Sequence, residues 1–298
     1  MQKVTPHLWF DKEAEDAVKF YTSLFPNSKT GNASRYGKEG FEIHRMPEGT
    51  VMTQDFQIAG LSIIALNGGP VFKFNPSVSF TVSCSEVAEL DRLWSALSDG
   101  GSILMPYQEY PFSKKYGWCN DKFGLSWQLG LSEESLSVTP SLIFTGDKAG
   151  KAKEAMDFYT SVFKNSKIEF TYPYGAGKEP DKPENLAHAV FYLEGQKFIA
   201  MDSAREHGFT FNEAISFLVN CDTQDEVDYF WNKMSANPAS EQCGWLKDKF
   251  GVSWQIVPQQ LSKLISDPNK GKAGRVMNAM LQMKKLDVKK LQEAYDQE

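Results

Sequence analysis

One short stretch occurs twice in this chain, as Asp121–Leu129 and as Asp248–Ile256. Both copies read Asp-Lys-Phe-Gly, followed by an apolar residue, Ser, Trp, Gln and a second apolar residue. Aspartate in the first place and glycine in the fourth suit a type I turn, because the carboxylate can accept hydrogen bonds from local amides and glycine tolerates the exit backbone. After the glycine, apolar and polar residues alternate with the period of a half-buried strand. Each copy therefore predicts a turn that leads into a strand.

The repetition extends far beyond this stretch. Each half opens with a predicted strand, Pro6–Phe10 or Pro140–Phe144, and a helix follows whose apolar residues recur at helical spacing. The ends of these helices are nearly identical in Phe20–Lys29 and Phe158–Lys167. A repeat of about half the chain indicates a domain duplication. Within each half the order strand, helix, three strands occurs twice, so we predict four β-α-β-β-β units.

The length of 298 residues also favours two domains. We predict a first domain over 1–131, a polar linker over 132–138 and a second domain over 139–260. Residues 261–298 have a helical pattern, in which Asp287 is a candidate helix cap. This tail is expected to pack on a domain or on a second chain.

Composition excludes several classes of protein. A net charge of −6 without a basic stripe argues against a nucleic-acid-binding surface. No apolar run approaches the roughly 18 residues that span a bilayer, and no signal peptide opens the chain. Four cysteines without C-x-x-C spacing fit a reducing compartment better than a disulfide framework or a zinc site. We therefore expect a cytoplasmic protein with neither membrane nor nucleic acid as partner.

The paired units, a histidine in the first strand and a final D-x-x-G-x-x-W-Q strand resemble the vicinal oxygen chelate superfamily of glyoxalase I, extradiol dioxygenases and bleomycin-resistance proteins. The sequence is most similar to its PhnB-like branch, often labelled 3-demethylubiquinone-9 3-methyltransferase, in Phe158–Phe163, Phe211–Phe217, Cys243–Pro258 and Arg275–Met280. The resemblance implies an α+β fold of two tandem glyoxalase-like domains, built from curved mixed sheets with helices outside. Single-domain relatives commonly pair, so the two domains are expected to form a pseudo-dimer within the chain, and a homodimer of whole chains is left open.

The resemblance also places candidate ligands in the hollow, or cup, of each curved sheet. Enzymes of the superfamily bind a divalent metal there through His or Glu of the first and last strands. When the family's ligand positions are mapped onto each half of the sequence, the first half places His7 and Gln128 in a first cup. The second half places Ser141 and Gln255 in a second cup. Amides and hydroxyls are neutral and compensate no metal charge, so no tight metal site is expected. Because opposite strand faces take opposite environments, the tryptophan beside each glutamine should face the helices.

PhnB-like proteins often carry a histidine in the third strand and an aspartate at the end of the fourth. The second half has both, as His188 and Asp202, which makes them the candidate catalytic residues. A His-carboxylate pair could hold a metal together with Gln255 or transfer a proton. The other interpretation is that His188 is a strand histidine satisfied by hydrogen bonds and Asp202 caps a turn.

The residues and the resemblance leave three classes of function open. We favour a small-molecule-binding protein of bleomycin-resistance type, without a metal. A metal-dependent lyase or dioxygenase-type enzyme acting in the second domain is the alternative, and a structural role with both cups filled by side chains is the third. The expected ligand-binding residues are His7, Trp9, Trp118, Gln128, Ser141, Trp245 and Gln255, although the tryptophans could equally fill core volume.

The methyltransferase label finds no support in the sequence. Common enzymes that use S-adenosylmethionine need a doubly wound sheet with a glycine-rich turn after its first strand. The nearest approach, Gly175-Ala-Gly177, lies in a polar loop. The sequence names neither a ligand nor a reaction, and it leaves open whether the protein is an enzyme.

Overall fold

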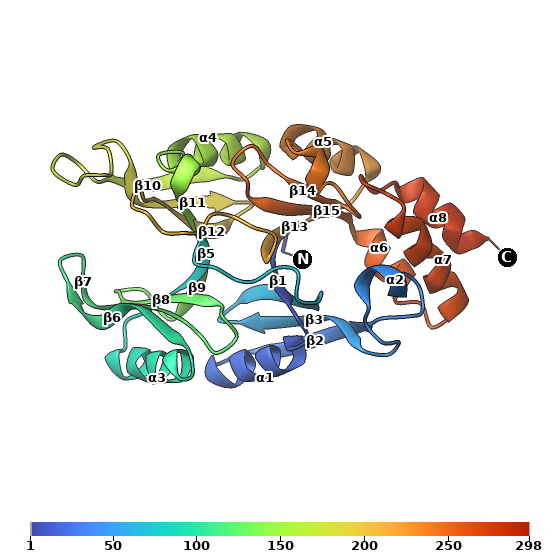
Figure 1. Cartoon of the computed structure of the whole chain (residues 1–298), viewed down its shortest axis with the longest axis horizontal. Helices are drawn as coiled ribbons and strands as arrows, with labels where there is room; N and C mark the ends of the chain where they lie inside the picture. The colour runs from blue at the N-terminus through green and yellow to red at the C-terminus, as the bar shows by residue number, and fades with distance from the viewer. Residues whose placement is uncertain (1, 298) are drawn as a thin grey trace.

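The computed structural model of the chain describes residues 2–297 (Figure 1). The β-α-β-β-β order is complete in the first three units. The first contains β1 (Val4–Phe10), α1 (Ala14–Leu24), β2 (Lys29–Arg35), the short α2 (Phe41–His44), β3 (Val51–Ile58) and β4 (Leu61–Asn67). The second contains β5 (Val78–Cys84), α3 (Val87–Ser98), β6 (Ser102–Tyr110), β7 (Ser113–Asn120) and β8 (Ser126–Leu131). The third contains β9 (Ser137–Phe144), η1 (Gly146–Lys148), α4 (Ala152–Val162), β10 (Lys167–Pro173), β11 (Leu186–Leu193) and β12 (Gln196–Asp202).

The fourth unit has one strand fewer. It contains β13 (Ile215–Cys221), α5 (Gln224–Met234), the 3-10 turn η2 (Pro238–Ser240), β14 (Trp245–Lys247) and β15 (Ser253–Pro258). The turn η2 stands where the second unit has β6. Pro238 has no N–H to give to a strand ladder, and the Asn237 side chain accepts a hydrogen bond from the Ala239 amide, which favours a turn.

The strands form two mixed sheets, and each sheet takes one unit from each half of the chain. The seven-stranded sheet has the order β14-β15-β13-β1-β4-β3-β2, and the eight-stranded sheet has the order β10-β11-β12-β9-β5-β8-β7-β6. The joins are antiparallel: β1 pairs with β13, placing His7 opposite Ser216, and β5 pairs with β9, placing Ser79 opposite Ser141.

This topology corrects the grouping of cup residues by sequence half. His7 and Gln255 share the seven-stranded sheet, whereas Ser141 and Gln128 share the eight-stranded one. We call the inner, helix-free face of the seven-stranded sheet the His7 cup and that of the eight-stranded sheet the Ser141 cup. Both cups therefore combine residues from the two sequence halves.

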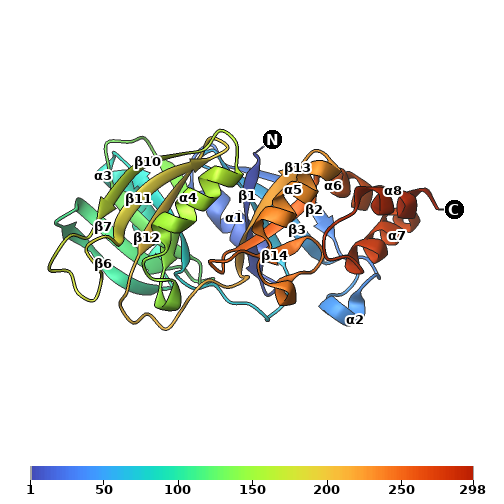
Figure 2. The ribbon, with the colours of Figure 1, turned by 90° about the horizontal axis from the view of Figure 1, so that it is seen from above.

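Both sheets are curved, with helices on the outside. In Figure 1, α1 and α3 cover the lower outer surface and α4 and α5 the upper one. Figure 2, seen from above, shows α4 and α5 side by side on that upper surface. The expected α+β architecture of curved mixed sheets under outer helices is thus confirmed.

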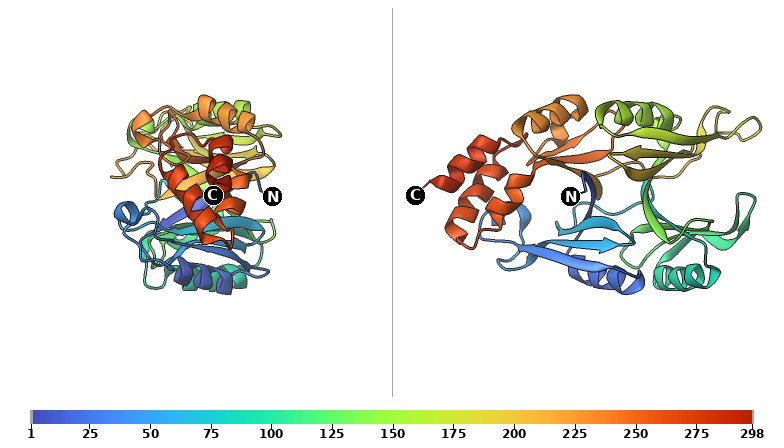
Figure 3. Two further views of the ribbon diagram at one scale, coloured as in Figure 1. Left: turned by 90° about the vertical axis from the view of Figure 1, so that its right-hand side faces the viewer. Right: turned by 180° about the vertical axis from the view of Figure 1, so that it is seen from behind.

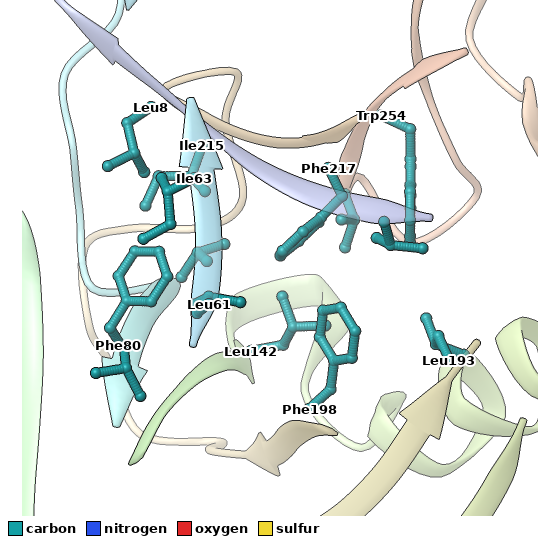
Figure 4. Close-up of a cluster of buried hydrophobic side chains, with 14 of the residues drawn as sticks. Leu8, Leu61, Ile63, Phe80, Leu142, Leu193, Phe198, Ile215, Phe217 and Trp254 are labelled. Carbon is teal, nitrogen blue, oxygen red and sulfur yellow. The ribbon is translucent and has the colours of Figure 1, made fainter. Parts of the chain in front are cut away.

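The apolar side chains between the sheets and their helices form one continuous core, which includes residues of both sheets. Figure 4 shows part of it, with Phe217 from β13 and Phe198 from β12. Their rings lie 5.4 Å apart although the two strands belong to different sheets. Burial of such large side chains stabilises the fold by about 1.5–3 kcal/mol each.

The tail forms α6 (Gln259–Ile265), α7 (Lys270–Leu281) and α8 (Val288–Asp296) around a small apolar cluster of its own. Asp287 caps α8, as predicted, by accepting a hydrogen bond from the Lys290 amide. The three helices lie at the end of the molecule beside the seven-stranded sheet (Figure 3). Among residues 2–297, no helix combines the length and apolarity needed to cross a bilayer.

Candidate functional site

The two Asp-x-Phe-Gly turns each bind a strand to a helix through the carboxylate of the aspartate. The Asp121 carboxylate accepts hydrogen bonds from the Tyr21 hydroxyl (2.7 Å), the Trp127 indole N–H (2.8 Å) and the amides of Phe123 (2.9 Å) and Leu125 (3.0 Å). The Asp248 carboxylate accepts the same set from Tyr159 (2.7 Å), Trp254 (2.9 Å), Phe250 (2.8 Å) and Val252 (3.0 Å). Burial raises the pKa of both carboxyls, that of Asp248 to about 6. With four donors on each carboxylate, these aspartates hold the turn, the tryptophan and the helix together.

The strand after each turn divides its side chains as predicted. The Trp127 ring lies 5.4 Å from the Tyr21 ring of α1, on the helix side. Gln128 points to the other face, where its Nε2 donates to Ser79 Oγ at 2.8 Å. Gln255 makes the equivalent bond to Ser216 Oγ at 2.9 Å.

Three polar residues cross the floor of the His7 cup in register. His7 lies opposite Ser216, and Ser216 lies beside Ser253 on β15. Adjacent strands are about 4.8 Å apart, so His7 and Ser253 are separated by roughly 10 Å with Ser216 between them.

Aromatic rings lie over this floor. The Trp245 ring, on the strand position opposite Gln255, lies 5.9 Å from the His7 ring and 6.0 Å from the Trp9 ring, both edge-to-face. Phe72 continues the wall at 5.0 Å from Trp9. The Trp9 indole N–H donates to the Gly69 carbonyl at 2.7 Å. The structure therefore brings together His7, Trp9, Trp245 and Gln255 of the residues predicted from sequence.

Two buried polar atoms in this cup lack a hydrogen-bond partner within residues 2–297: His7 Nδ1 and Ser253 Oγ. His7 is only 4% exposed and Ser253 only 1%. Burial lowers the pKa of His7 to about 3, so its imidazole is neutral at neutral pH. An unpartnered buried polar group costs roughly 1–3 kcal/mol, which is why such groups are rare.

The Ser141 cup has the same framework, and the polar side chains at its centre have partners, whereas Asn120 Oδ1 and Ser137 Oγ on the same face have none within residues 2–297. Thr81 Oγ1 and Ser141 Oγ share a hydrogen bond of 2.7 Å. The Tyr116 hydroxyl donates to Gln128 Oε1 at 2.7 Å, and the Trp118 indole N–H donates to a serine of the same floor, Ser126, at 2.7 Å. The predicted residues Trp118, Gln128 and Ser141 thus meet in one cup, but each is already hydrogen-bonded to a neighbouring side chain of that cup.

The structure does not bring His188 and Asp202 together. The Asp202 carboxylate accepts hydrogen bonds from the amides of Gly150 (2.8 Å), Ala152 (3.0 Å) and Leu186 (2.9 Å), so it ties β11 to the start of α4 on the helix side of the sheet. His188 alternates with Ala189, which belongs to the helix-side core, so its ring lies on the opposite face. Burial and the Lys197 ammonium lower the pKa of His188.

Neither cup fits a divalent metal. The proposed set of His188, Asp202 and Gln255 is divided between two faces and two sheets. The His7 cup offers one imidazole with hydroxyls and an amide, which supply no negative charge. Within the described part of the chain, 2–297, no three His, Cys, Asp or Glu side chains are grouped closely enough to hold a metal ion.

The sequence did not single out Ser253 or Phe72. Ser253 occupies the same motif position as Ser126, so no sequence signal separates them. Only the different placement of Trp118 and Trp245 leaves one serine partnered and the other not.

A family model described as 3-demethylubiquinone-9 3-methyltransferase matches residues 2–130 and again 136–257. Among solved structures, a PhnB protein of Bacillus cereus is 41% identical and covers 44% of this chain and 100% of its own, with a TM-score of 0.40. Protein PA1353 of Pseudomonas aeruginosa is 19% identical over 43% of this chain and 96% of its own, with a TM-score of 0.36. Glyoxalase I of Zea mays is 12% identical over 77% of this chain and 80% of its own, with a TM-score of 0.47. No curated protein matches the sequence.

Proposed function

We propose that this chain, which belongs to the PhnB-like family described as 3-demethylubiquinone-9 3-methyltransferase, binds a small molecule in the His7 cup without a metal. The family model matches the chain in two tandem copies. The observation that carries this proposal is the buried His7 Nδ1, which has no partner within residues 2–297. A ligand that hydrogen-bonds to this atom would remove the cost of leaving it unpaired.

The surroundings of His7 suit such a ligand. Binding sites for small molecules are mostly apolar and aromatic, with a few polar groups that fix orientation. The His7 cup has this composition, with Trp9, Phe72 and Trp245 as apolar surface and His7, Ser253 and Gln255 as polar groups. Trp9 and Trp245 are half-buried, so both remain partly open to solvent.

The Ser141 cup is assigned a structural role. The polar side chains at its centre are already hydrogen-bonded to neighbouring side chains of that cup, so a ligand would have to break those hydrogen bonds. Replacing a hydrogen bond by an equivalent one yields little net free energy.

Methyl transfer from S-adenosylmethionine is not proposed. That cofactor commonly binds at the carboxyl edge of a doubly wound parallel sheet, whereas both sheets here are mixed and curved around cups. Gly175 and Gly177 lie in the loop that joins the antiparallel strands β10 and β11.

A fragment screen by ligand-observed NMR tests the proposal. Fragments that bind the wild-type protein should lose binding in His7→Ala and keep it in Ser141→Ala, the matched substitution in the other cup. Fragments whose binding survives His7→Ala but not Ser141→Ala would place the site in the Ser141 cup and contradict the proposal. An absence of any binder at millimolar concentration would contradict a binding function.

A further inference from the structure

The two cups differ in the position of one indole ring. Trp118 lies opposite Gln128 and Trp245 opposite Gln255, in the same register. The Trp118 indole N–H donates to Ser126 Oγ at 2.7 Å. The Trp245 ring instead packs against His7 and Trp9.

This difference accounts for the unpartnered Ser253 Oγ of the His7 cup, and it places the Trp245 ring next to His7. Ser253 is the counterpart of Ser126, and without an indole N–H its Oγ has no partner within residues 2–297. At the same time the Trp245 ring lies edge-to-face against His7, whose Nδ1 also has no partner in that part of the chain. No hydrogen bond joins the two rings, so Trp245 does not supply the partner that His7 Nδ1 lacks within residues 2–297.

We propose that Trp245 occupies the place of the ligand's ring, and that the ligand is an uncharged planar aromatic molecule with a hydrogen-bonding substituent for His7 Nδ1. When the ligand binds, the indole moves onto Ser253 in the arrangement that Trp118 and Ser126 already show. This inference rests on the proposed function, because it names the ligand class of that same cup.

The movement is a rotation of the Trp245 side chain on a fixed backbone. The amide and carbonyl of Trp245 both bond to Gln242, and the amides of Cys243 and Gly244 bond to Met283 and Lys284. The indole itself makes only ring contacts with His7 and Trp9 in the described part of the chain, so it can turn without breaking a backbone hydrogen bond.

The charges along the floor favour an uncharged ligand. The register row through His7 runs from Asp55 on β3 through Ile64, His7, Ser216 and Ser253 to Lys247 on β14. Its two charged residues lie at the ends of the row, and Lys247 is already paired with Glu213 at 2.7 Å. An ionic ligand over His7 would be buried without a counter-charge, which is costly.

Three probes of one shape and different charge test this inference: benzamide, benzoate and benzamidinium at neutral pH. The readout is the indole N–H resonance of Trp245 in the 15N-labelled protein, assigned by its loss in Trp245→Phe, with the Trp118 resonance as internal reference. Benzamide should shift the Trp245 resonance and leave that of Trp118 in place, and the two ions should bind at least tenfold more weakly.

Variants separate the movement of the indole from binding itself. Trp245→Ala should bind benzamide more tightly, because no indole has to be displaced. Ser253→Ala should weaken binding about fivefold, the value of one lost hydrogen bond, whereas Ser126→Ala should not change it. In the Trp245→Ala background, Ser253→Ala should have no further effect.

The outcomes are distinguishable. Benzamide binding without a shift of the Trp245 resonance, equal effects of the two serine variants, or tighter binding of an ion would overturn this inference and leave the binding function standing. No binding of any probe to either the wild type or Trp245→Ala would overturn this inference, and together with the absence of any binder in the fragment screen it would overturn both.

Discussion

At the scale of single residues, the two buried aspartates each tie a turn, a tryptophan and a helix together. Asp121 and Asp248 each accept four hydrogen bonds, and one of the four comes from a tyrosine on a helix. The rest of the motif is thereby held against that helix. Its repeated appearance in the sequence reflects this structural task, and the cup chemistry lies on the other face of the same strand.

Tyr159→Phe should lower the free energy of unfolding by about 1.5–3 kcal/mol, because the Asp248 carboxylate loses one of its donors. Urea unfolding followed by circular dichroism measures this change. Tyr21→Phe, the matched variant in the first half, should have a similar effect. Tyr229→Phe is the control, because Tyr229 is exposed and its hydroxyl bonds only to a backbone carbonyl. It should cost less than either of the other two substitutions.

Asp248 should also make stability depend on pH. Its pKa is raised from 3.8 to about 6 in the folded protein, so the folded state binds more protons than the unfolded state between these values. The contribution is present below about pH 4, falls as the pH rises, and is lost above about pH 6. The stability of the wild type relative to Asp248→Asn should therefore decrease by about 3 kcal/mol across this window. A relative stability that rises with pH would contradict the raised pKa.

The paired serines give a prediction for the ligand-free protein. Ser126→Ala should cost about 1 kcal/mol or more, since it leaves the Trp118 indole N–H without its acceptor. Ser253→Ala should raise the free energy of unfolding by about 1 kcal/mol, because it removes a buried hydroxyl that has no partner within 2–297. Thermal unfolding of the two variants checks this difference, and an equal loss in both would show that Ser253 is also bonded.

At the scale of elements, the tail replaces part of the strand that the fourth unit lacks. The amides of Cys243 and Gly244 donate to the carbonyls of Met283 (2.8 Å) and Lys284 (2.7 Å), so the tail pairs with the segment that leads into β14. The same segment carries Trp245 into the His7 cup. Docking of the tail and the position of Trp245 are therefore coupled through Gly244.

Gly244→Ala should loosen the tail. The residue has a φ of +88°, and a Cβ there would lie 3.0 Å from the Ile256 carbonyl oxygen and 3.1 Å from Leu286. We expect faster proteolysis within residues 259–297 and a loss of about 1 kcal/mol or more. Gly195→Ala is the matched control, with a φ of +81° and no atom within 4 Å of the added Cβ. Gly195→Ala should lose stability through backbone strain alone and leave proteolysis of the tail unchanged. Equal proteolysis of the tail in both variants would show that docking of the tail does not depend on Gly244.

At the scale of the whole molecule, both sheets hold the two sequence halves together. The joins β1 with β13 and β5 with β9 lie at the centre of each sheet. Each half taken alone would expose β1 and β5, or β9 and β13, as unpaired edges. Unpaired edges invite pairing with another chain.

Separately produced halves, residues 1–135 and 136–298, should therefore self-associate when alone and combine when mixed. Analytical ultracentrifugation measures the association, and the mixture should recover the unfolding temperature of the whole chain more closely than either half. A half that remains monomeric with an unchanged unfolding temperature would contradict the role of the shared sheets.

The sequence by itself determined the local elements of this protein. Alternation and helical spacing predict the strands and helices of the repeat, and the Asp-x-Phe-Gly pattern predicts the turn and the two faces of the strand after it, because these features depend on residues close together in the chain. The helix cap at Asp287 was predicted for the same reason.

Only the tertiary structure decided which units pair and which polar atoms remain free. The two halves have the same pattern, so pairing within a half and pairing across halves satisfy it equally, and His7 was grouped with Gln128 when it shares its sheet with Gln255. His188 and Asp202 are close in adjacent strands but lie on opposite faces. Ser126 and Ser253 are identical in sequence context, and only the placement of a distant ring on His7 and Trp9 distinguishes them. Contacts between distant segments, which local pattern does not encode, therefore decide where the candidate site lies.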